Sequence, residues 1–213
     1  MKLRKILLKR SQLYLILDRP RFTRSSLEKI VSLAASQEIG LIQLRDKFSP
    51  KGDVLKFALK LAKQVKLTKT LLIINDYVDV AVAACADGVH LGQEDLSLKR
   101  ARKILGKDKI IGISCHNLAQ ALKAQKAGAD YIGIGPLYAT PTKPGFRGIG
   151  LKAVAELKGK IKIPYFAIGN IGLDNIKEIM TVGVRRIAVC RAILKADDAQ
   201  GVVKRLYQRL RKR

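Results

Sequence analysis

The sequence contains no tryptophan, and aromatic residues make up only 5% of its 213 residues. Acidic residues are also scarce: 17 aspartates and glutamates stand against 42 lysines and arginines, a formal net charge of +25. Such a basic chain could bind nucleic acid, but so few aromatic side chains offer no platform on which bases could stack. Much of the basic surplus recurs at helical spacing or near the termini, as on solvated helix faces. The charge indicates an anionic ligand or incidental polyanion binding, and no specific nucleic-acid partner is expected.

Cysteine and long apolar runs are scarce as well. The three cysteines, Cys85, Cys115 and Cys190, are an odd number without the spacing of metal ligands, which fits a reducing compartment. No segment approaches the roughly 20 apolar residues of a membrane-spanning helix. The first residues begin like a signal peptide, but Lys9 and Arg10 interrupt the apolar stretch. We therefore expect a cytoplasmic protein with no membrane partner.

Short apolar runs alternate with amphipathic segments from one end of the chain to the other. The runs that predict strands are Gln12–Asp18, Leu41–Asp46, Leu71–Asp76, Gly88–Leu91, Ile110–Cys115, Tyr131–Gly135, Pro164–Gly169 and Arg186–Cys190. The segments that predict helices are Ser25–Glu38, Lys51–Lys66, Val78–Cys85, Leu98–Leu105, Leu118–Ala129, Leu151–Gly159, Leu173–Val182 and Asp198–Leu210. Strands this apolar favour an all-parallel sheet covered by helices. We predict a single (β/α)8 TIM barrel over residues 1–213; the alternative is an open doubly wound sheet, although no Gly-x-Gly-x-x-Gly motif follows the first strand.

Polar residues gather where the predicted strands end, which is where a barrel of this kind carries its active site. The second strand ends with Gln43, Arg45 and Lys47, and strand alternation sends all three to one side. An amide beside two cations suits a polar ring attached to a polyphosphate. The alternative is a pair of exposed basic residues at a strand end.

Carboxylates follow the next two strands. Asp76 comes directly after Asn75, and Asp95 follows the fourth strand. Either aspartate could simply cap a helix. Mg²⁺ typically takes one or two carboxylates together with water and phosphate oxygens. Because cations and a phosphate-binding loop lie nearby in the predicted fold, we predict a Mg²⁺ site at Asp76 and Asp95.

The loop after the sixth strand carries two hydroxyls, Thr140 and Thr142, and the ammonium of Lys143. These groups can bind a phosphate or diphosphate, although such loops are usually plain solvated turns. The loops after the seventh and eighth strands often form a phosphate site in this fold; tight strand–helix turns are the alternative. Two anionic sites in one barrel suggest an enzyme that joins two phosphorylated molecules.

The fifth strand ends with Ser114, Cys115 and His116. Neighbours on a strand point to opposite faces, so Cys115 and His116 do not form a catalytic dyad. Ser114 and His116 share a face, and either could contact a ligand. Cys115 is expected to be buried packing.

Six motifs at these strand ends together resemble the thiamine phosphate synthase family, over essentially the whole chain from Tyr14 to about Lys204. The motifs are Gln43–Lys47, Ile74–Asp76, Gly88–Asp95, Gly112–His116, Tyr131–Pro136 with Thr140–Lys143, and Ala167–Gly169. The resemblance implies a (β/α)8 barrel that couples hydroxymethylpyrimidine diphosphate to a thiazole phosphate and releases diphosphate. It also implies a dissociative mechanism with Mg²⁺ as cofactor.

The same resemblance assigns roles by position. Gln43 would hold the pyrimidine, and Asp76 with Asp95 would hold Mg²⁺. The residues implied at the diphosphate are Arg45, Lys47, Asn75 and Lys143, with Ser114 nearby; Arg45, Lys47 and Lys143 would neutralise the departing charge. The residues implied at the thiazole phosphate are Thr140, Thr142, Gly169, Asn170, Cys190 and Arg191.

Two positions depart from the family's usual pattern. Asn170 stands where a second glycine is usual, and Arg191 stands where a small residue, often serine, is usual. Arg191 could strengthen phosphate binding through a bidentate contact or fill the site. A related thiazole tautomerase, using His116 as acid–base, is the alternative on the same fold. A basic nucleic-acid-binding protein is the alternative from another class, and an oligomer is compatible with the sequence.

Overall fold

Eight parallel strands close into a barrel in the computed structural model, which describes residues 2–19, 33, 39–140, 145 and 147–211. The strands follow one another around the barrel in chain order, and β1 closes the ring on β8 with Leu13 opposite Ile187. The strands are β1 Leu13–Arg19, β2 Leu41–Asp46, β3 Leu71–Asn75, β4 Gly88–Leu91, β5 Ile110–Cys115, β6 Tyr131–Ile134, β7 Tyr165–Ile168 and β8 Ile187–Val189. The predicted (β/α)8 barrel is confirmed, and the open-sheet alternative is wrong.

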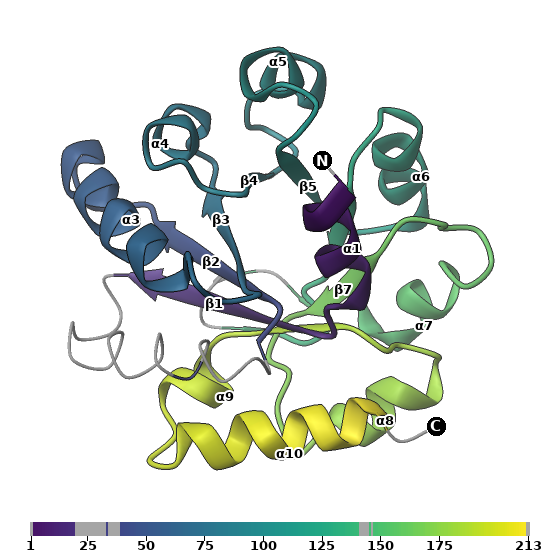
Figure 1. Cartoon of the computed structure of the whole chain (residues 1–213). Helices are drawn as coiled ribbons and strands as arrows, with labels where there is room; N and C mark the ends of the chain where they lie inside the picture. Colours follow the sequence, from purple (N-terminus) through teal and green to yellow (C-terminus); the bar gives the residue numbers. More distant parts are fainter. Residues whose placement is uncertain (1, 20–32, 34–38, 141–144, 146, 212–213) are drawn as a thin grey trace.

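Helices surround the barrel and cover its strands (Figure 1). The described helices are α1 Lys2–Arg10, α3 Lys51–Val65, α4 Val78–Ala83, α5 Leu98–Leu105, α6 Leu118–Lys126, α7 Gly150–Ala155, α8 Ile176–Thr181, α9 Arg191–Leu194 and α10 Ala199–Arg211. The predicted helix Ser25–Glu38 lies, except for Leu33, outside the described residues. No helix in the described part of the chain is long and apolar enough to cross a membrane.

Strand alternation divides the apolar side chains between two cores. In β1, Leu13, Leu15 and Leu17 pack outward in the larger core beneath the helices, whereas Tyr14 and Ile16 point into the barrel. The strands read as continuous apolar runs because both of their faces are buried. Each strand can therefore deliver a polar group to the barrel interior only at an inward-facing position.

Some predicted helix boundaries are wrong. The helix predicted from Leu173 begins only at Ile176, because the side chain of Asn175 accepts a hydrogen bond from the Gly172 N–H at 3.0 Å and holds a turn there. The short helix α9 and the amino-terminal helix α1 were not predicted from the sequence. The α5 boundary is correct, and Gly106 ends that helix with φ +73°, a conformation that favours glycine.

Helix α1 lies across the amino-terminal end of the barrel rather than in the outer ring of helices (Figure 1). Its Leu8 packs among the interior side chains. Arg4 pairs with Asp87 at 2.6 Å, just before β4, and Lys5 pairs with Asp130 at 3.1 Å, just before β6. The stretch that begins like a signal peptide is thus a helix that closes the end of the barrel opposite the strand ends with the predicted site.

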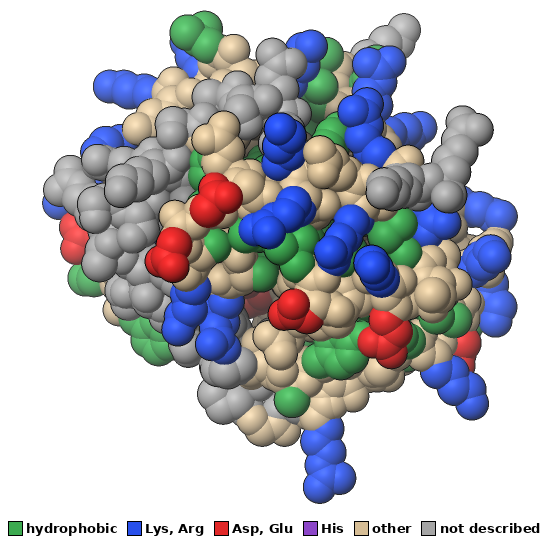
Figure 2. Space-filling model, turned by 90° about the horizontal axis from the view of Figure 1, so that it is seen from below, with side chains coloured by type: hydrophobic (Ala, Val, Ile, Leu, Met, Phe, Trp, Pro, Cys, Tyr) green, Lys and Arg blue, Asp and Glu red, His purple; other side chains and the backbone are tan. Residues whose placement is uncertain are grey.

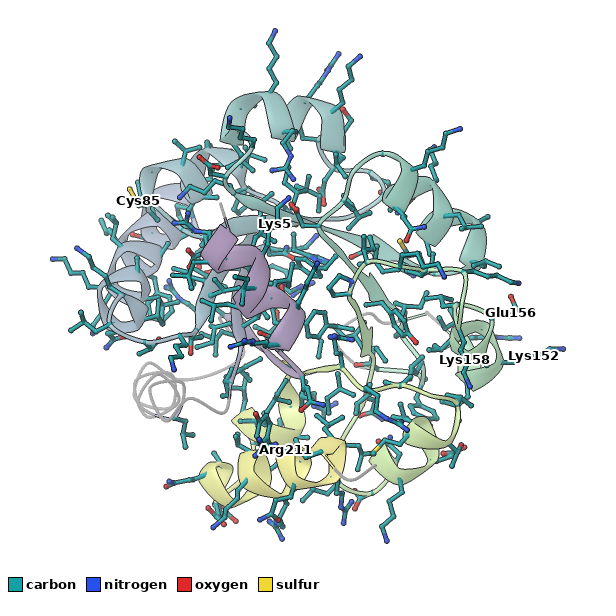
Figure 3. The ribbon with its side chains drawn as sticks, turned by 45° about the vertical axis from the view of Figure 1, so that its right-hand side comes forward. Lys5, Cys85, Lys152, Glu156, Lys158 and Arg211 are labelled. Carbon is teal, nitrogen blue, oxygen red and sulfur yellow. The ribbon has the colours of Figure 1, made fainter. Side chains whose placement is uncertain are left out.

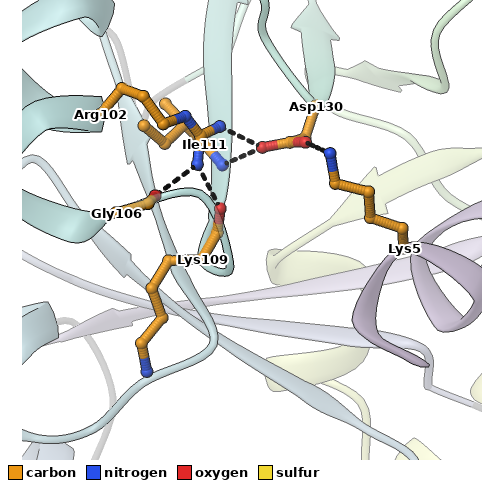
Figure 4. A network of polar contacts seen from close by, with 6 residues as sticks. All are labelled: Lys5, Arg102, Gly106, Lys109, Ile111 and Asp130. Carbon is orange, nitrogen blue, oxygen red and sulfur yellow. Dashed lines mark hydrogen bonds and ion pairs between the residues drawn. The ribbon is translucent and has the colours of Figure 1, made fainter. Parts of the chain in front are cut away.

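Asp130 is the centre of a polar network at this end (Figure 4). Its carboxylate accepts a hydrogen bond from the Ile111 N–H at 2.9 Å and pairs with Arg102 at 2.5 Å and with Lys5. Arg102 also donates to the carbonyl of Gly106 at 3.0 Å. The side chain of Asp130 is only 6% exposed, so removing it would leave buried donors without an acceptor.

Replacing Asp130 by alanine is expected to lower the free energy of unfolding by about 3 kcal/mol, because the guanidinium of Arg102 would lose its buried partner. Lys5→Met removes a pair whose lysine is 46% exposed and should cost less than about 1 kcal/mol. Urea denaturation of both variants measures the difference. Equal losses would show that the network adds nothing beyond an ordinary surface ion pair.

On the face formed by α8 and α10, the positive charge is not gathered into one band (Figure 2). Lys152 and Lys158, at α7 and just beyond it, point away from the barrel (Figure 3). Figure 2 shows lysine and arginine side chains interspersed with carboxylates and apolar groups on the face formed by α8 and α10. These side chains are solvated, as the sequence indicated. The cytoplasmic location and the lack of a specific nucleic-acid partner stay predictions of the sequence.

Candidate active site

A cavity of about 570 Å³ opens among the carboxyl ends of the strands. Every strand of the barrel contributes to its wall, either directly or through the residues that follow it. The predicted site residues that line it are Gln43, Arg45, Asn75, Ser114, Thr140, Gly169, Asn170, Cys190 and Arg191. The volume is typical of a small-molecule site. Thr142 and Lys143 lie outside the described residues.

Lys47, Asp76 and Asp95 form a separate cluster beside the cavity residue Asn75. The ammonium of Lys47 lies 2.8 Å from an Asp76 oxygen. Burial, and next to it the neighbouring Asp95 carboxyl, raise the pKa of Asp76, while Lys47 opposes the shift. A single half-exposed lysine only partly compensates the negative charge of a buried carboxylate that lies beside a second one. A further positive charge would therefore stabilise the Asp76–Asp95 pair.

Neither aspartate serves as a helix cap. The N-cap of α4 is Tyr77, without a side-chain cap bond, and the N-cap of α5 is Ser97, whose hydroxyl accepts from the Arg100 N–H. Asp95 instead accepts from the Gly92 N–H at 2.6 Å. Asp76 has φ +61°, a left-handed conformation that is uncommon for a residue other than glycine and that gathers at functional sites.

The two carboxylates fit Mg²⁺ better than a metal that needs an all-protein cage. Among the described residues, no three or more histidine, cysteine, aspartate or glutamate side chains are grouped so that they could hold a metal. Mg²⁺ needs only one or two carboxylates, because it keeps water and takes oxygens from a bound phosphate. Asp76 and Asp95 supply two such groups next to the cavity wall.

Arg45 reaches the cavity from an ion pair that was not predicted from the sequence. Its guanidinium bonds to Asp18, a fully buried carboxylate at the end of β1. Asp18 and Arg45 are direct neighbours in the β1–β2 register. A carboxylate at the end of an otherwise apolar strand was the available signal, and strand pairing was needed to find its partner. The pair holds a cation at the cavity wall.

A chain of polar side chains crosses the barrel interior beneath the cavity. Gln43 donates through Nε2 to the Tyr14 hydroxyl at 2.5 Å, and the hydroxyls of Tyr14 and Tyr131 lie 2.8 Å apart. His90 contacts the Tyr131 hydroxyl through Nδ1 at 3.0 Å and the Ser114 hydroxyl through Nε2 at 2.9 Å. Burial raises the pKa of both tyrosines well above its usual value. The tyrosines are therefore neutral and hydrogen-bonded.

Tyr14, Tyr131 and His90 had no predicted role in the site. All three lie at inward-facing positions of β1, β6 and β4 and are buried. Polar side chains at inward-facing positions of apolar strands were the signal that could have found them. Their meeting across the barrel depends on its closure.

The β7 loop combines a glycine with an asparagine in positive-φ conformations. Gly169 has φ +113°, and a Cβ atom there would lie 2.5 Å from the Leu137 nitrogen, so no other residue fits. Asn170 has φ +52°. Asparagine tolerates this region better than most residues. The departure at Asn170 therefore keeps the kind of backbone conformation that a second glycine would adopt.

The β8 end brings an added cation and a protonated thiol to the cavity. Arg191 and Lys195 both line the wall, one turn apart. Burial, the largest effect, raises the pKa of Cys190 to about 12. Burial alone raises the pKa of Cys115 to about 12, and that side chain packs in the outer core. Neither thiol is thus a ready nucleophile, and the packing role predicted for Cys115 is confirmed.

His116 lines the cavity on the same side as Ser114, as strand alternation predicted. Its Nδ1–H donates to the Gly135 carbonyl at 2.5 Å. The bond fixes which ring nitrogen carries the hydrogen. The ring is therefore oriented by the β6 end.

Comparison with known proteins places the chain in a family. Residues 13–193 match the family described as thiamine monophosphate synthase. The chain is 44% identical over 196 residues to a thiamine-phosphate synthase of Clostridium novyi, covering 92% of this chain and 96% of that protein. It is 42% identical over 191 residues to one of Halalkalibacterium halodurans, covering 89% and 90%. The solved structure of a thiamine phosphate pyrophosphorylase from Pyrococcus furiosus aligns with a TM-score of 0.84 at 32% identity, covering 97% of this chain and all of that one. The chain belongs to the thiamine monophosphate synthase family.

Proposed function

We propose that this chain is a thiamine phosphate synthase, which joins hydroxymethylpyrimidine diphosphate to a thiazole phosphate and releases diphosphate. One observation carries the proposal: a single cavity is lined both by Gln43 and Arg45 from β2 and by the loops that follow β7 and β8. This arrangement offers places for two phosphorylated molecules within one wall. Family membership supports the same pair of substrates.

The proposed reaction breaks the bond between the pyrimidine methylene carbon and the diphosphate oxygen, and the oxygen leaves with the bonding electrons. The thiazole nitrogen then forms the new carbon–nitrogen bond. Arg45 and Lys47, with Lys143 implied by resemblance, would neutralise the charge that develops on the leaving group. The cavity wall would hold the two reactants close together, which lowers the entropic cost of their meeting.

Asp76 and Asp95 are the proposed ligands of Mg²⁺. When bound, the ion would supply additional positive charge toward the diphosphate. The raised pKa of Asp76 beside Asp95 and the proximity of both to Asn75 support this assignment. The carboxylate pair also favours the synthase over the tautomerase, because moving a proton on a thiazole needs no diphosphate-bound metal.

Incubation with both phosphorylated substrates and Mg²⁺, followed by mass spectrometry for thiamine phosphate and an assay for diphosphate, tests the function. Stoichiometric formation of both products is expected. Incubation with the thiazole tautomer alone is the matched test of the alternative. Its conversion, without coupled product in the complete mixture, would replace the proposal with the tautomerase that uses His116.

Arg191 is expected to strengthen thiazole phosphate binding. Replacing it by serine should raise the KM for the thiazole phosphate by about tenfold, because one charge-assisted hydrogen bond to the phosphate is lost. The value of kcat should change little. Arg205→Ser on the exposed face of α10 removes the same charge far from the cavity and should leave the KM unchanged. A lower KM in the Arg191 variant would show that the arginine obstructs the site.

A further inference from the structure

The polar chain beneath the cavity links Gln43, which the family resemblance places at the pyrimidine, to Ser114, which lines the same cavity. It runs from Gln43 on β2 through Tyr14, Tyr131 and His90 to Ser114 on β5. Gln43, Tyr14, His90 and Ser114 line the cavity, whereas Tyr131 is not among the lining residues. The interior members are buried among apolar side chains, where an unmade hydrogen bond would be costly.

The donors along this chain follow one direction. Each neutral tyrosine hydroxyl has a single hydrogen to donate. Gln43 donates through Nε2 to the Tyr14 oxygen, and the Tyr131 oxygen, 2.8 Å away, is the acceptor in reach for the hydrogen of Tyr14. With that hydrogen on its oxygen, Tyr131 satisfies its own hydrogen at Nδ1 of His90, 3.0 Å away.

The direction continues to the fifth strand. With Nδ1 accepting, the neutral His90 ring carries its hydrogen on Nε2 and donates it to the Ser114 oxygen, 2.9 Å away. The hydroxyl hydrogen of Ser114 is therefore directed elsewhere, and Ser114 lines the cavity. At the other end, Gln43 uses its nitrogen for Tyr14 and turns its carbonyl oxygen away from that partner.

We propose that Tyr14, Tyr131 and His90 are positioning residues that lock the Gln43 carbonyl oxygen and the Ser114 hydroxyl hydrogen toward the ligand, so that the cavity selects an aminopyrimidine over its oxo counterpart. This inference rests on the proposed function for the identity of the ring. An aminopyrimidine presents an N–H donor beside a ring-nitrogen acceptor. The oxo ring presents an acceptor beside an N–H donor and thus reverses both contacts.

The hydrogen bonds from Gln43 to Ser114 can reverse their direction only all together. Turning the Gln43 amide over would require Tyr14, Tyr131, the His90 tautomer and Ser114 to reverse together, because every intermediate arrangement leaves two facing donors or two facing acceptors in the barrel interior. A single amide in a wet site would turn freely and accept either ring. The buried tyrosines thereby fix the orientation of the Gln43 amide, and the fixed amide distinguishes the amino ring from the oxo ring.

Solution NMR of the ligand-free protein with isotope-labelled histidine tests the direction without any assay of activity. The protein has only two histidines, so the imidazole signals that remain in a His116→Asn variant belong to His90. His90 is expected to be neutral with its hydrogen on Nε2. Tyr14→Phe should leave this tautomer unchanged, because Tyr131 still donates to His90. Tyr131→Phe removes the donor to Nδ1 and should shift the ring toward a mixture of tautomers.

Binding of the amino and oxo forms of the pyrimidine diphosphate, measured by calorimetry without the thiazole, tests the selectivity. Binding is measured rather than turnover, because the ring amine also donates electrons to the reacting carbon. Replacing the amine would therefore change the reaction rate independently of recognition. The wild type should prefer the amino ring by about a hundredfold or more. Tyr14→Phe and Tyr131→Phe should each reduce this preference at least about tenfold.

Phe166→Leu is the matched control. Phe166 packs edge-on against Tyr14 and Tyr131, with ring centroids 5.3 and 5.7 Å apart, and makes no hydrogen bond in their chain. This variant should lose stability but keep the His90 tautomer and the ratio of the two dissociation constants. A merely structural role for the tyrosines predicts that all three variants behave alike.

The inference is overturned if wild-type His90 carries its hydrogen on Nδ1, or if both tyrosine variants retain the full preference for the amino ring. Failure of the proposed function looks different. In that case neither pyrimidine diphosphate binds to the wild type and no thiamine phosphate forms, while the tautomer measurement still reports the direction of the chain. Tight binding of both rings by the wild type would reject the selectivity alone.

Discussion

Replacing Asp76 by asparagine is expected to lower the rate of thiamine phosphate formation at least about a hundredfold while leaving the fold intact. The substitution removes one of the two carboxylates proposed for Mg²⁺ and keeps the shape of the side chain. Asparagine is preferable to alanine here because Asp76 has φ +61°, a conformation that asparagine tolerates and alanine does not. A loss of activity can then be attributed to the lost charge rather than to backbone strain.

The metal itself provides a second measurement. Calorimetric titration of Mg²⁺ in the presence of diphosphate should show binding to the wild type and at least about tenfold weaker binding to Asp76→Asn, because a metal ligand has lost its charge. Asp79→Asn is the control. Asp79 lies three residues further along, is 63% exposed and pairs with Lys51 at 3.0 Å. Unchanged Mg²⁺ affinity and unchanged activity in the Asp76 variant would reject the metal site.

Replacing Arg45 by methionine is expected to reduce both stability and activity. The fully buried carboxylate of Asp18 would lose its partner, at a cost of about 3 kcal/mol in the free energy of unfolding. The cavity would also lose a cation proposed to stabilise the leaving diphosphate, which should reduce kcat/KM about a hundredfold or more. Urea denaturation and steady-state kinetics measure the two effects separately.

A double variant separates the two roles of Arg45. Adding Asp18→Asn to Arg45→Met removes the unpaired buried charge, so most of the lost stability should return. Activity should remain low, because the asparagine restores no positive charge at the cavity wall. If the double variant recovered activity together with stability, Arg45 would be a structural residue and not part of the diphosphate site.

Regular periodicity explains why so much of the barrel could be predicted. The strand Leu41–Asp46 was predicted with its observed bounds, because a strand covered on both sides is apolar throughout and ends where polar residues begin. The same alternation placed Gln43 and Arg45 on one side of β2, and both line the cavity. Predictions of this kind depend only on neighbours along the chain.

Helix α1 shows where such reasoning ends. Its sequence is mostly charged, and Leu8 is its only buried apolar residue, so no stripe of apolar positions marks it as a helix that packs on a core. It is held by ion pairs from Arg4 and Lys5 to Asp87 and Asp130. These aspartates precede two different strands, and only the closed barrel brings them under one helix.

The sequence by itself determined the barrel, the order of its strands and the polar residues at their ends, because burial and strand alternation act locally. The tertiary structure decided which of those residues meet. Tyr14 and Tyr131 are 117 positions apart, yet their hydroxyls lie 2.8 Å from each other, and Arg45 found Asp18 only through the pairing of β1 with β2. Closure of the sheet turns inward-facing positions of distant strands into neighbours, and this is why the buried chain from Gln43 to Ser114 became visible only in three dimensions.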